Sequence, residues 1–392
     1  MTAAATSYTS HRIPEKAAEL VAQSALNKLG ASKAAAAIFF ASSEYRRHYA
    51  KIGKMIKDIT GTENVIGSSA AGILTEEIEI ERRRGLSLML IHPDQMEAAS
   101  FMVKNLQESN FRAGEKAGAI TRSSVSPNLL LLFPDPFSFQ SHLFFDGFEN
   151  VCGYVPMVGG AAAENGKEEK TYQIHGEDAS FDSVVGLSLT GDFRFETGIT
   201  RSCQPFGDSF RVTRAEGNMI YEMDGRPAYD ILLESISHIQ FDHPDEIFQR
   251  VFLGTPMKSF QTDFKKSDYF IRNIMGVNAK KGMVACVGPV EEGDFVTFTV
   301  KDSSLARQDL QKMLDELKQR IYPHEPSLGF YFNCAARGQA LYGEPSQDIA
   351  LITRRFPSVP ILGLFSYGEI APIDHVNHLH HHSGVLVLIV KV

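Results

Sequence analysis

The sequence predicts an α/β fold in which helices cover mixed parallel and antiparallel sheets, arranged as two modules. Two observations lead to this prediction. A strand–helix–strand unit that ends in a glycine-punctuated loop and a further strand occurs three times along the chain. A stretch of alternating polar and apolar residues, typical of antiparallel strands, separates the second copy from the third. We expect an N-terminal helix within residues 1–30, a first module over 31–225 and a second module over 226–392.

The N-terminal segment is predicted to form a helix over residues 14–29. Pro14 stands at its first turn, where a helix tolerates proline. Ala18, Val21 and Ala25 recur at helical spacing and give the helix one apolar face. We therefore expect a surface helix that leads into the first module.

The three copies share one order, namely a buried strand, a helix, a strand that runs into the glycine loop, and a last strand. The first copy covers residues 34–40, 42–59, 64–74 and 85–92. The second covers residues 128–135, 139–150, 155–166 and 183–191. The third covers residues 328–338, 345–356, 359–373 and 383–392. Because a helix-length crossover joins the first two strands of each copy, we expect these strands to pair in parallel, and the last strands to extend the sheets antiparallel.

Two further details concern the ends of elements. The helix of the first copy is expected to begin at Ser42, with serine as its N-cap. Between the second and third copies, helices are predicted over 226–237 and 303–321 among the antiparallel strands. The dipeptide Asp224–Gly225 breaks a strand run and marks the predicted boundary between the modules.

Composition excludes several classes of protein. The chain has 392 residues, of which 43% are hydrophobic and 22% charged, as in an ordinary globular protein. A net charge of -8 argues against nucleic acid and anionic membranes as partners. The four cysteines are widely spaced, which indicates neither a disulfide framework nor a zinc site. The longest apolar runs are far shorter than a membrane span, and the N-terminus lacks a secretory signal pattern, so we expect a cytoplasmic protein.

The glycine loops of the three copies are the first candidate for a binding site. Ligands bind beyond the carboxyl ends of parallel strands, and the first two strands of one copy should end at the same edge. In the third copy this places two loops side by side, with the candidate ligand-binding residues Asn333, Cys334, Arg337, Phe365, Tyr367, Gly368 and Glu369. Glu164 holds the comparable place in the second copy. We also expect an ion pair between Glu369 and Arg337.

Cys334 carries an enzymatic alternative. An arginine stands three residues after it, and a nearby cation lowers the pKa of a thiol. With Glu369 as the base, such a thiol would act on a small metabolite. No histidine is dictated nearby, and cysteines are usually buried, so we expect no catalytic residues.

Four segments together resemble one known family. They are "SCQPFGDSFRVTRAEGNMIYEMDGRPAYDIL" (202–232), "IRNIMGVNAKKGMVACVGPVEEGDFVTFTVKD" (271–302), "FNCAARG" (332–338) and "LGLFSYGEIAPI" (362–373). In order and spacing they resemble FIST proteins, named for F-box and intracellular signal transduction, from about residue 30 to the end. Ser202 departs from the family, which usually has glycine there, and so does "LHHHS" near the C-terminus.

The resemblance implies an N-terminal and a C-terminal FIST module and a sensory, non-enzymatic function. Bacterial stand-alone members of this length are similar to a nitric-oxide sensor that binds haem b and acts on a histidine kinase or a cyclic-di-GMP enzyme. The expected cofactor is therefore haem. The expected partners are nitric oxide or another small ligand, one of these enzymes, and a second copy of the chain.

The histidines are the candidate iron ligands under this hypothesis, because imidazole is a common ligand of haem iron. Three lie in a run, His380, His381 and His382, and His175 is a further candidate. If the run enters a strand, His380 and His382 face one side and His381 the other. His142 is an alternative. A sensor of an organic ligand such as an amino acid without haem, the Cys334/Glu369 enzyme and an interaction scaffold stay open beside the haem sensor.

Overall fold

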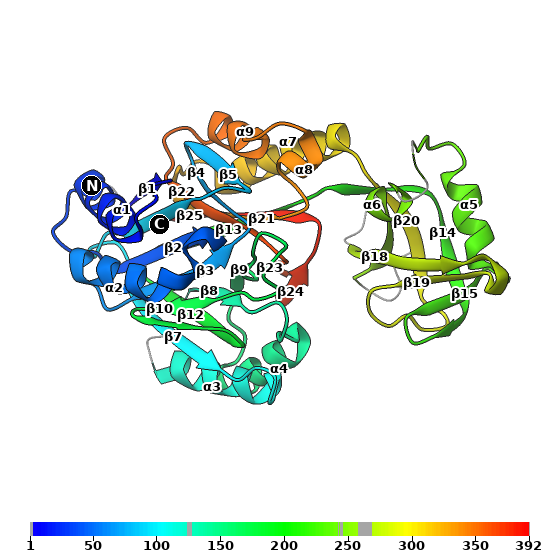
Figure 1. The fold of residues 1–392 in the computed structure, drawn as a ribbon, viewed down its shortest axis with the longest axis horizontal. Helices are drawn as coiled ribbons and strands as arrows, with labels where there is room; N and C mark the ends of the chain where they lie inside the picture. Colours follow the sequence, from blue (N-terminus) through cyan, green and yellow to red (C-terminus); the bar gives the residue numbers. More distant parts are fainter. Residues whose placement is uncertain (1–2, 124–127, 242, 244–245, 258–268, 392) are drawn as a thin grey trace. The chain divides into compact units, whose positions relative to one another are not determined.

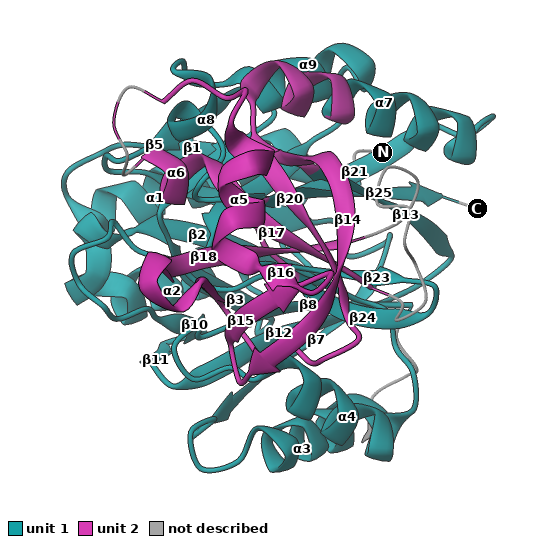
Figure 2. Cartoon of the chain, turned by 90° about the vertical axis from the view of Figure 1, so that its right-hand side faces the viewer, with its two compact units in different colours: residues 1–200, 310–379, 383–392 teal, residues 201–309, 380–382 magenta. Residues whose placement is uncertain are grey.

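The computed structural model describes residues 3–123, 128–241, 243, 246–257 and 269–391. The chain forms two compact units, coloured separately in Figure 2. Unit 1 comprises residues 1–200, 310–379 and 383–392, and unit 2 comprises residues 201–309 and 380–382. The boundary predicted at residue 225 falls within unit 2, at the turn before strand β16 (Arg226–Pro227). Each unit is described by itself.

Unit 1 contains the three copies, except that Arg201, residues 303–309 and His380, at the ends of elements of the third copy, belong to unit 2. Each copy begins one strand and one helix earlier than the sequence pattern indicated (Figure 1). The first copy consists of β1 (Ala4–Thr9), α1 (Pro14–Leu29), β2 (Ala36–Ser42), α2 (Tyr49–Thr60), β3 (Val65–Ala70), β4 (Gly72–Thr75), β5 (Ile78–Glu81) and β6 (Leu86–Ile91). The predicted N-terminal helix is α1, and it packs against β1 and β6 as an integral part of this copy.

The second and third copies repeat this order. The second consists of β7 (Glu97–Lys104), α3 (Asn110–Ser123), β8 (Leu129–Pro134), α4 (Ser141–Cys152), β9 (Met157–Gly160), β10 (Gln173–His175), β11 (Asp178–Ser180) and β12 (Ser183–Thr190). The third consists of β13 (Phe193–Arg201), α7 (Ser303–Ile321), β21 (Pro326–Cys334), α8 (Gln339–Tyr342), α9 (Gln347–Arg355), β22 (Ile361–Ser366), β23 (Glu369–Ile373), β24 (Val376–His380) and β25 (Ser383–Lys391). Val392, the last residue of the predicted final strand, lies outside the described residues.

The predicted mixed sheets are confirmed. In each copy the strands before and after the second helix pair in parallel, as in the register Phe332↔Leu364 between β21 and β22. The last strand of the copy then pairs antiparallel with the first of these two, as β25 does with β21. Consequently the two parallel strands end at the same edge of the sheet, as the sequence analysis expected.

The copies exchange strands in a cycle. The pair β4–β5 of the first copy joins the sheet of the third, through β4 and β22. The pair β10–β11 of the second copy joins the sheet of the first, through β10 and β3. The pair β23–β24 of the third copy joins the sheet of the second, through β23 and β9. Each resulting six-stranded sheet is therefore completed by two strands from another copy.

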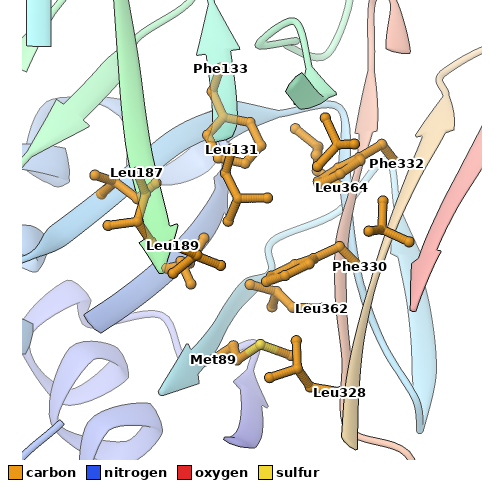
Figure 3. Close-up of a cluster of buried hydrophobic side chains, with 14 of the residues drawn as sticks. Met89, Leu131, Phe133, Leu187, Leu189, Leu328, Phe330, Phe332, Leu362 and Leu364 are labelled. Atoms are coloured by element: carbon orange, nitrogen blue, oxygen red, sulfur yellow. The ribbon is translucent and has the colours of Figure 1, made fainter. Parts of the chain in front are cut away.

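The inner faces of these sheets share one apolar core. Phe40, Phe133 and Phe332 occupy equivalent positions in the three copies, and their rings meet, with centroids 5.1 Å apart for Phe40 and Phe133 and 5.7 Å for Phe133 and Phe332. Figure 3 shows leucine and phenylalanine side chains of β8 and β12 facing those of β21 and β22. The outer faces are covered by α1 and α2, by α3 and α4, and by α7 and α9. Burial of this many large side chains supplies the main stabilisation of unit 1.

The start of the first-copy helix differs from its prediction. Residues Ser43–His48 form a 3₁₀ turn, and α2 begins only at Tyr49. Ser42 does not cap the helix, because its hydroxyl accepts a hydrogen bond from the backbone N–H of Gly85 at 3.0 Å. The helix predicted over 303–321 matches α7 in both ends.

Unit 2 is an antiparallel sheet closed on itself. Its elements are β14 (Cys203–Glu216), β15 (Met219–Met223), β16, α5 (Ala228–Ile236), α6 (Ile247–Arg250), β17 (Val251–Pro256), β18 (Tyr269–Asn278), β19 (Met283–Cys286) and β20 (Phe295–Lys301). The strand order β14-β20-β17-β18-β19-β15 returns to β14, which pairs with β15 as well as with β20. Closure removes the free edges that an open sheet would expose. Among the described residues, no helix is long and apolar enough to cross a membrane.

Candidate functional site

The loops that leave the three parallel strand pairs meet in a ring of backbone hydrogen bonds. Each bond joins two copies, and the equivalent glycines from which the positions are counted are Gly67, Gly159 and Gly363. The donor is the backbone N–H of the fourth residue after one of these glycines. The acceptor is the carbonyl of the second residue after the equivalent glycine of another copy. The bonds are Ala71 N–H to Phe365 O at 3.1 Å, Tyr367 N–H to Ala161 O at 3.2 Å, and Ala163 N–H to Ser69 O at 3.0 Å. The cyclic exchange of strands therefore brings the three predicted glycine loops to one place.

A cavity of about 240 Å³ opens beside this ring. All three copies line it, through residues Ala71, Glu81, Arg82, Glu164, Asn165, Gly166, Ala335, Phe365 and Tyr367. The lining combines small residues, two aromatic rings, two carboxylates and one guanidinium. Such a mixture of apolar walls and a few convergent polar groups is typical of a small-molecule site.

Glu164 is a fixed negative charge in the wall of the cavity. Its Oε2 accepts the backbone N–H groups of Lys167 and Glu168, both at 2.9 Å, and its Oε1 accepts the hydroxyl of Tyr367 at 3.0 Å. Burial alone would raise the pKa of Glu164, but these donors outweigh it and hold the pKa below its ordinary value. Burial and the Glu164 charge together raise the pKa of Tyr367 to about 12, so the phenol stays protonated.

Glu81 and Arg82 bring a second carboxylate and a cation to the same cavity. Glu81 ends β5, and its Oε1 accepts the backbone N–H of Gln339 at 2.9 Å. Burial raises the pKa of Glu81 above its ordinary value. Arg82 has a φ of 55°, in the left-handed region that is uncommon for residues other than glycine. Backbone strain of this kind is concentrated at binding sites.

Of the predicted ligand-binding residues, Phe365 and Tyr367 line the cavity and the others are not among its lining residues. Cys334 is 8% exposed and precedes Ala335 of the lining. The carbonyl of Gly368 accepts the N–H of Ala161 at 2.8 Å, which joins β23 to β9. These residues therefore lie near the cavity without all reaching it.

Asn333 and Arg337 belong to a buried polar network centred on Asp348. Arg337 pairs with Asp348 through Nε to Oδ2 at 3.1 Å and Nη2 to Oδ1 at 3.2 Å, and both side chains are 0% exposed. Tyr331, Tyr342 and Asn333 also donate to Asp348. Burial would raise the pKa of Asp348, but the guanidinium and these donors hold it below its ordinary value.

The predicted ion pair between Glu369 and Arg337 is wrong, because Asp348 is the partner of Arg337. Glu369 is 0% exposed and accepts the hydroxyls of Ser366 at 2.8 Å and Ser383 at 2.6 Å. Burial raises the pKa of Glu369 to about 8. A protonated carboxyl needs no cation, which explains how this side chain is accommodated in the interior.

None of the predicted histidines is among the residues that line the cavity. In unit 1, His175 shares a hydrogen bond of 2.9 Å with the hydroxyl of Ser100, and burial lowers its pKa. In unit 2, His380 is buried, with its ring centroid 6.3 Å from that of Phe270. The Nε2 of His382 lies 2.7 Å from Asn273 Oδ1, and burial lowers the pKa of His382 to about 3. His142, the alternative, is exposed on α4.

The predicted alternation of His380, His381 and His382 along one strand is wrong. His380 ends β24, β25 begins at Ser383, and the two histidines between them form a bend in which His382 has a φ of 53°. Side chains in such a bend do not follow the two-residue repeat of a strand.

The cavity does not fit a haem. None of its lining residues is a histidine or a cysteine. Its volume is below the roughly 300 Å³ at which pockets for drug-sized molecules begin. Within the described ranges, no group of three or more His, Cys, Asp or Glu side chains could hold a metal ion.

Sequence reasoning missed Glu81, Arg82 and Asp348. The first two lie in "ERRRG", which looks like an ordinary charged turn, and they reach the cavity only because β5 joins the sheet of the third copy. Asp348 lies inside a predicted helix and resembles a solvated helix residue. The sequence contains no local signal for either role, since both depend on contacts between distant segments.

The mixed sheets with helices on their faces define an α/β protein, and comparison with family models divides the chain into two modules along the sequence. Residues 35–226 match the FIST N domain and residues 228–372 match the FIST C domain. The chain therefore belongs to the FIST family, whose domain is a sensory domain associated with signal transduction.

Three proteins similar to this chain are themselves named as uncharacterized. The uncharacterized protein Rv0628c of Mycobacterium tuberculosis (strain ATCC 25618 / H37Rv) is 26% identical over 326 residues, which cover 83% of each chain. The uncharacterized protein Mb0898c of Mycobacterium bovis is 24% identical over 379 residues, covering 96% of this chain and 95% of the relative. The uncharacterized protein MJ1623 of Methanocaldococcus jannaschii is 23% identical over 345 residues, covering 82% and 65%.

Proposed function

We propose that this protein is a sensor that binds a small organic ligand in the cavity and passes the binding event to a separate signalling enzyme. The observation that carries the proposal is that loops of all three copies line one cavity. A ligand there would contact elements that are otherwise joined by the ring of three backbone hydrogen bonds. Ligand contacts that differ between two arrangements of these loops would shift the population of the two.

A binding role is favoured over catalysis by the state of the predicted catalytic groups. Glu369, the predicted base, is fully buried, and both of its oxygens already accept serine hydroxyls. It is not among the residues that line the cavity. A general base must reach the proton that it abstracts, directly or through one water. The Cys334/Glu369 enzyme therefore has less support than a ligand sensor.

The haem and nitric-oxide hypothesis stays a prediction, as do its partners, a histidine kinase or a cyclic-di-GMP enzyme. Titration with haemin tests it without reference to the cavity. A Soret band that shifts with nitric oxide and disappears on alanine replacement of His175, His380, His381 or His382 would support haem. Absence of the band would contradict it and would leave the organic-ligand sensor as proposed.

The cavity proposal is tested by filling the cavity. Ala71→Leu places a larger side chain in the lining, and Ala340→Leu makes the same change on an exposed residue of α8. A library of small polar metabolites is screened by thermal shift against the original protein and both variants. We expect hits that stabilise the original protein and the Ala340→Leu variant but not Ala71→Leu. Hits that stabilise all three equally would place binding elsewhere and contradict the proposal.

A further inference from the structure

We propose that the ligand of this cavity carries a primary ammonium group, held by Glu81 beside the fixed charge of Glu164. The inference rests on the proposed function and adds the chemical class of the ligand. It follows from the charges that the cavity gathers, from how its two carboxylates are held, and from its size.

The two carboxylates in the cavity are not matched by ion pairs, although the charge of Arg82 acts on Glu81 and opposes the rise of its pKa. Among the described residues, neither Glu81 nor Glu164 forms an ion pair with a lysine, an arginine or a histidine. Asp348, the fully buried carboxylate of the third copy, by contrast forms an ion pair with Arg337. Charges that are withdrawn from water are costly unless they are paired. A bound cation would supply the missing partner.

Glu81 is the carboxylate that a ligand can contact directly. Only its Oε1 accepts a hydrogen bond from a described residue, the N–H of Gln339. The loop behind it is packed closely, because a Cβ added at Gly338 would lie 2.6 Å from the carboxyl carbon of Glu81. The backbone of Gly338, with a φ of 57°, thus lies directly against the Glu81 carboxylate, and Glu81 is one of the residues that line the cavity. A carboxylate accepts up to about four hydrogen bonds, so Glu81 retains capacity for an ammonium donor.

Glu164 contributes a second negative charge that cannot move or be neutralised easily. Its side chain is 4% exposed, and two backbone amides and the Tyr367 hydroxyl fix both oxygens. These donors are neutral, so the negative charge of Glu164 is not compensated by them. In a partly buried site, an uncompensated charge acts more strongly on a ligand than it would in water. Glu81 and Glu164 together outnumber Arg82, the single cation of the lining, so a cation is favoured over an anion of equal size.

Arg82 places a positive charge in the lining of the cavity without reversing the net negative charge of that lining. Its side chain is exposed, lines the cavity, and forms no ion pair with a described residue. A ligand whose far end is anionic would therefore be accepted near Arg82, while the ammonium end lies at the carboxylates. With room for roughly eight water molecules at about 30 Å³ each, the cavity limits the ligand to a small compound.

The test uses primary amines of this size, each paired with its N-acetyl derivative, which keeps the carbon skeleton and removes the positive charge. Binding to the full chain is measured by calorimetry. Glu81→Gln and Glu164→Gln each remove one carboxylate charge from the cavity. Glu77→Gln is the matched control, because Glu77 lies in the turn between β4 and β5, in the same hairpin as Glu81 but outside the cavity, with a side chain 50% exposed.

We expect amines to bind and their N-acetyl derivatives not to bind. Glu81→Gln and Glu164→Gln should each weaken binding by at least about tenfold, and Glu77→Gln should leave it unchanged. If N-acetyl derivatives or simple carboxylic acids bind as well as amines, and Glu81→Gln has no effect, the inference is overturned while the sensor proposal survives. If no bound compound is sensitive to Ala71→Leu, the sensor proposal itself fails. Should Glu164→Gln disturb folding, the N-acetyl comparison and Glu81→Gln still decide the question.

Discussion

The first and third copies place different chemistry at equivalent positions between sheet and helix. Gly67 and Gly363 hold the same register against their parallel neighbours, Phe39 and Tyr331. Counted from these glycines, the pairs of equivalent residues are Phe39 and Tyr331, Ala41 and Asn333, and Ile52 and Asp348. The first copy fills this layer with apolar side chains, whereas the third fills it with a buried ionic network. The same backbone arrangement therefore accommodates an apolar core in one copy and an ionic core in another.

The difference has a consequence for the site. The network holds Arg337, and Arg337 belongs to the loop that carries Ala335 of the cavity lining and Gly338 behind Glu81. In the first copy the equivalent layer needs only to pack. In the third copy it also positions a loop, and directional hydrogen bonds do this better than apolar contacts, which have no preferred orientation.

The largest effect is expected from Asp348→Ala, which breaks the ionic core of the third copy. It leaves the fully buried guanidinium of Arg337 without its carboxylate. We expect the free energy of unfolding to fall by about 3–5 kcal/mol, measured by urea denaturation and circular dichroism. Ile52→Ala, at the equivalent position of the first copy, should cost about 2–5 kcal/mol through the cavity that it creates.

The ion pair of the third copy can also be removed as a whole, without leaving one charge behind. Adding Arg337→Met to Asp348→Leu replaces the ion pair with apolar side chains and should recover part of the loss. The recovery is incomplete because Tyr331, Asn333 and Tyr342 lose the carboxylate to which they donate. Ligand binding should not recover, because the loop would lose its directional contacts. Full recovery of both stability and binding would show that the network has no positioning role, and the comparison between the copies would lose its meaning.

The next-largest loss of stability is expected from replacing Gly363 with alanine, at the position that is Gly67 in the first copy. A Cβ at Gly363 would overlap the carbonyl oxygen of Tyr331, whereas at Gly67 it would lie 2.7 Å from the carbonyl oxygen of Phe39. Gly363→Ala should therefore destabilise unit 1 by about 3 kcal/mol, and Gly67→Ala by less. Denaturation midpoints of the two variants give the order. Equal midpoints would show that the closeness of the two strands does not matter.

The sequence predicted the repeated unit well and the site only in part. Apolar runs, glycine loops and helical spacing are local, so the three copies, α7 and the parallel strand pairs were predicted from them. The exchange of β4–β5, β10–β11 and β23–β24 was not, because strand edges choose partners in three dimensions. The same holds for Arg337, whose charge calls for a carboxylate without specifying Asp348 rather than Glu369. Glu81 lines the cavity because β4–β5 joins the sheet of the third copy, and its neighbours in the sequence do not indicate this position.

A smaller effect, with a pH dependence, is expected at Glu369, which is equivalent to Ile73 in the first copy. Its pKa of about 8 in the folded chain exceeds the ordinary value of 4.5. Between these values the folded chain holds a proton that the unfolded chain has lost, so folded stability falls as pH rises from 4.5 to 8. Glu369→Gln removes this dependence. We expect the variant to gain about 2 kcal/mol relative to the original protein between pH 5 and pH 6.5.

The measurement for Glu369 is the difference in free energy of unfolding between the two proteins at each pH. Glu79, whose pKa burial also raises to about 8, is present in both and cancels in the difference. A difference that stays constant with pH would mean that Glu369 does not hold a proton in the folded chain. The third copy would then contain a second buried charge, and its contrast with Ile73 would be larger than described.

The smallest effect is expected from Tyr367→Phe, at the position that is Ala71 in the first copy and Ala163 in the second. The change removes the hydroxyl that donates to Glu164 at 3.0 Å and keeps the ring beside Phe137. Two backbone amides still bind Glu164, so we expect a loss of only about 1 kcal/mol in the free energy of unfolding. The pKa of Glu164 should rise, because one of the donors that lower it is gone, and carbon-13 NMR of the labelled carboxyl reports the change. An unchanged pKa would show that the amides alone set the charge of Glu164, and that the tyrosine distinguishes the third copy by its aromatic surface alone.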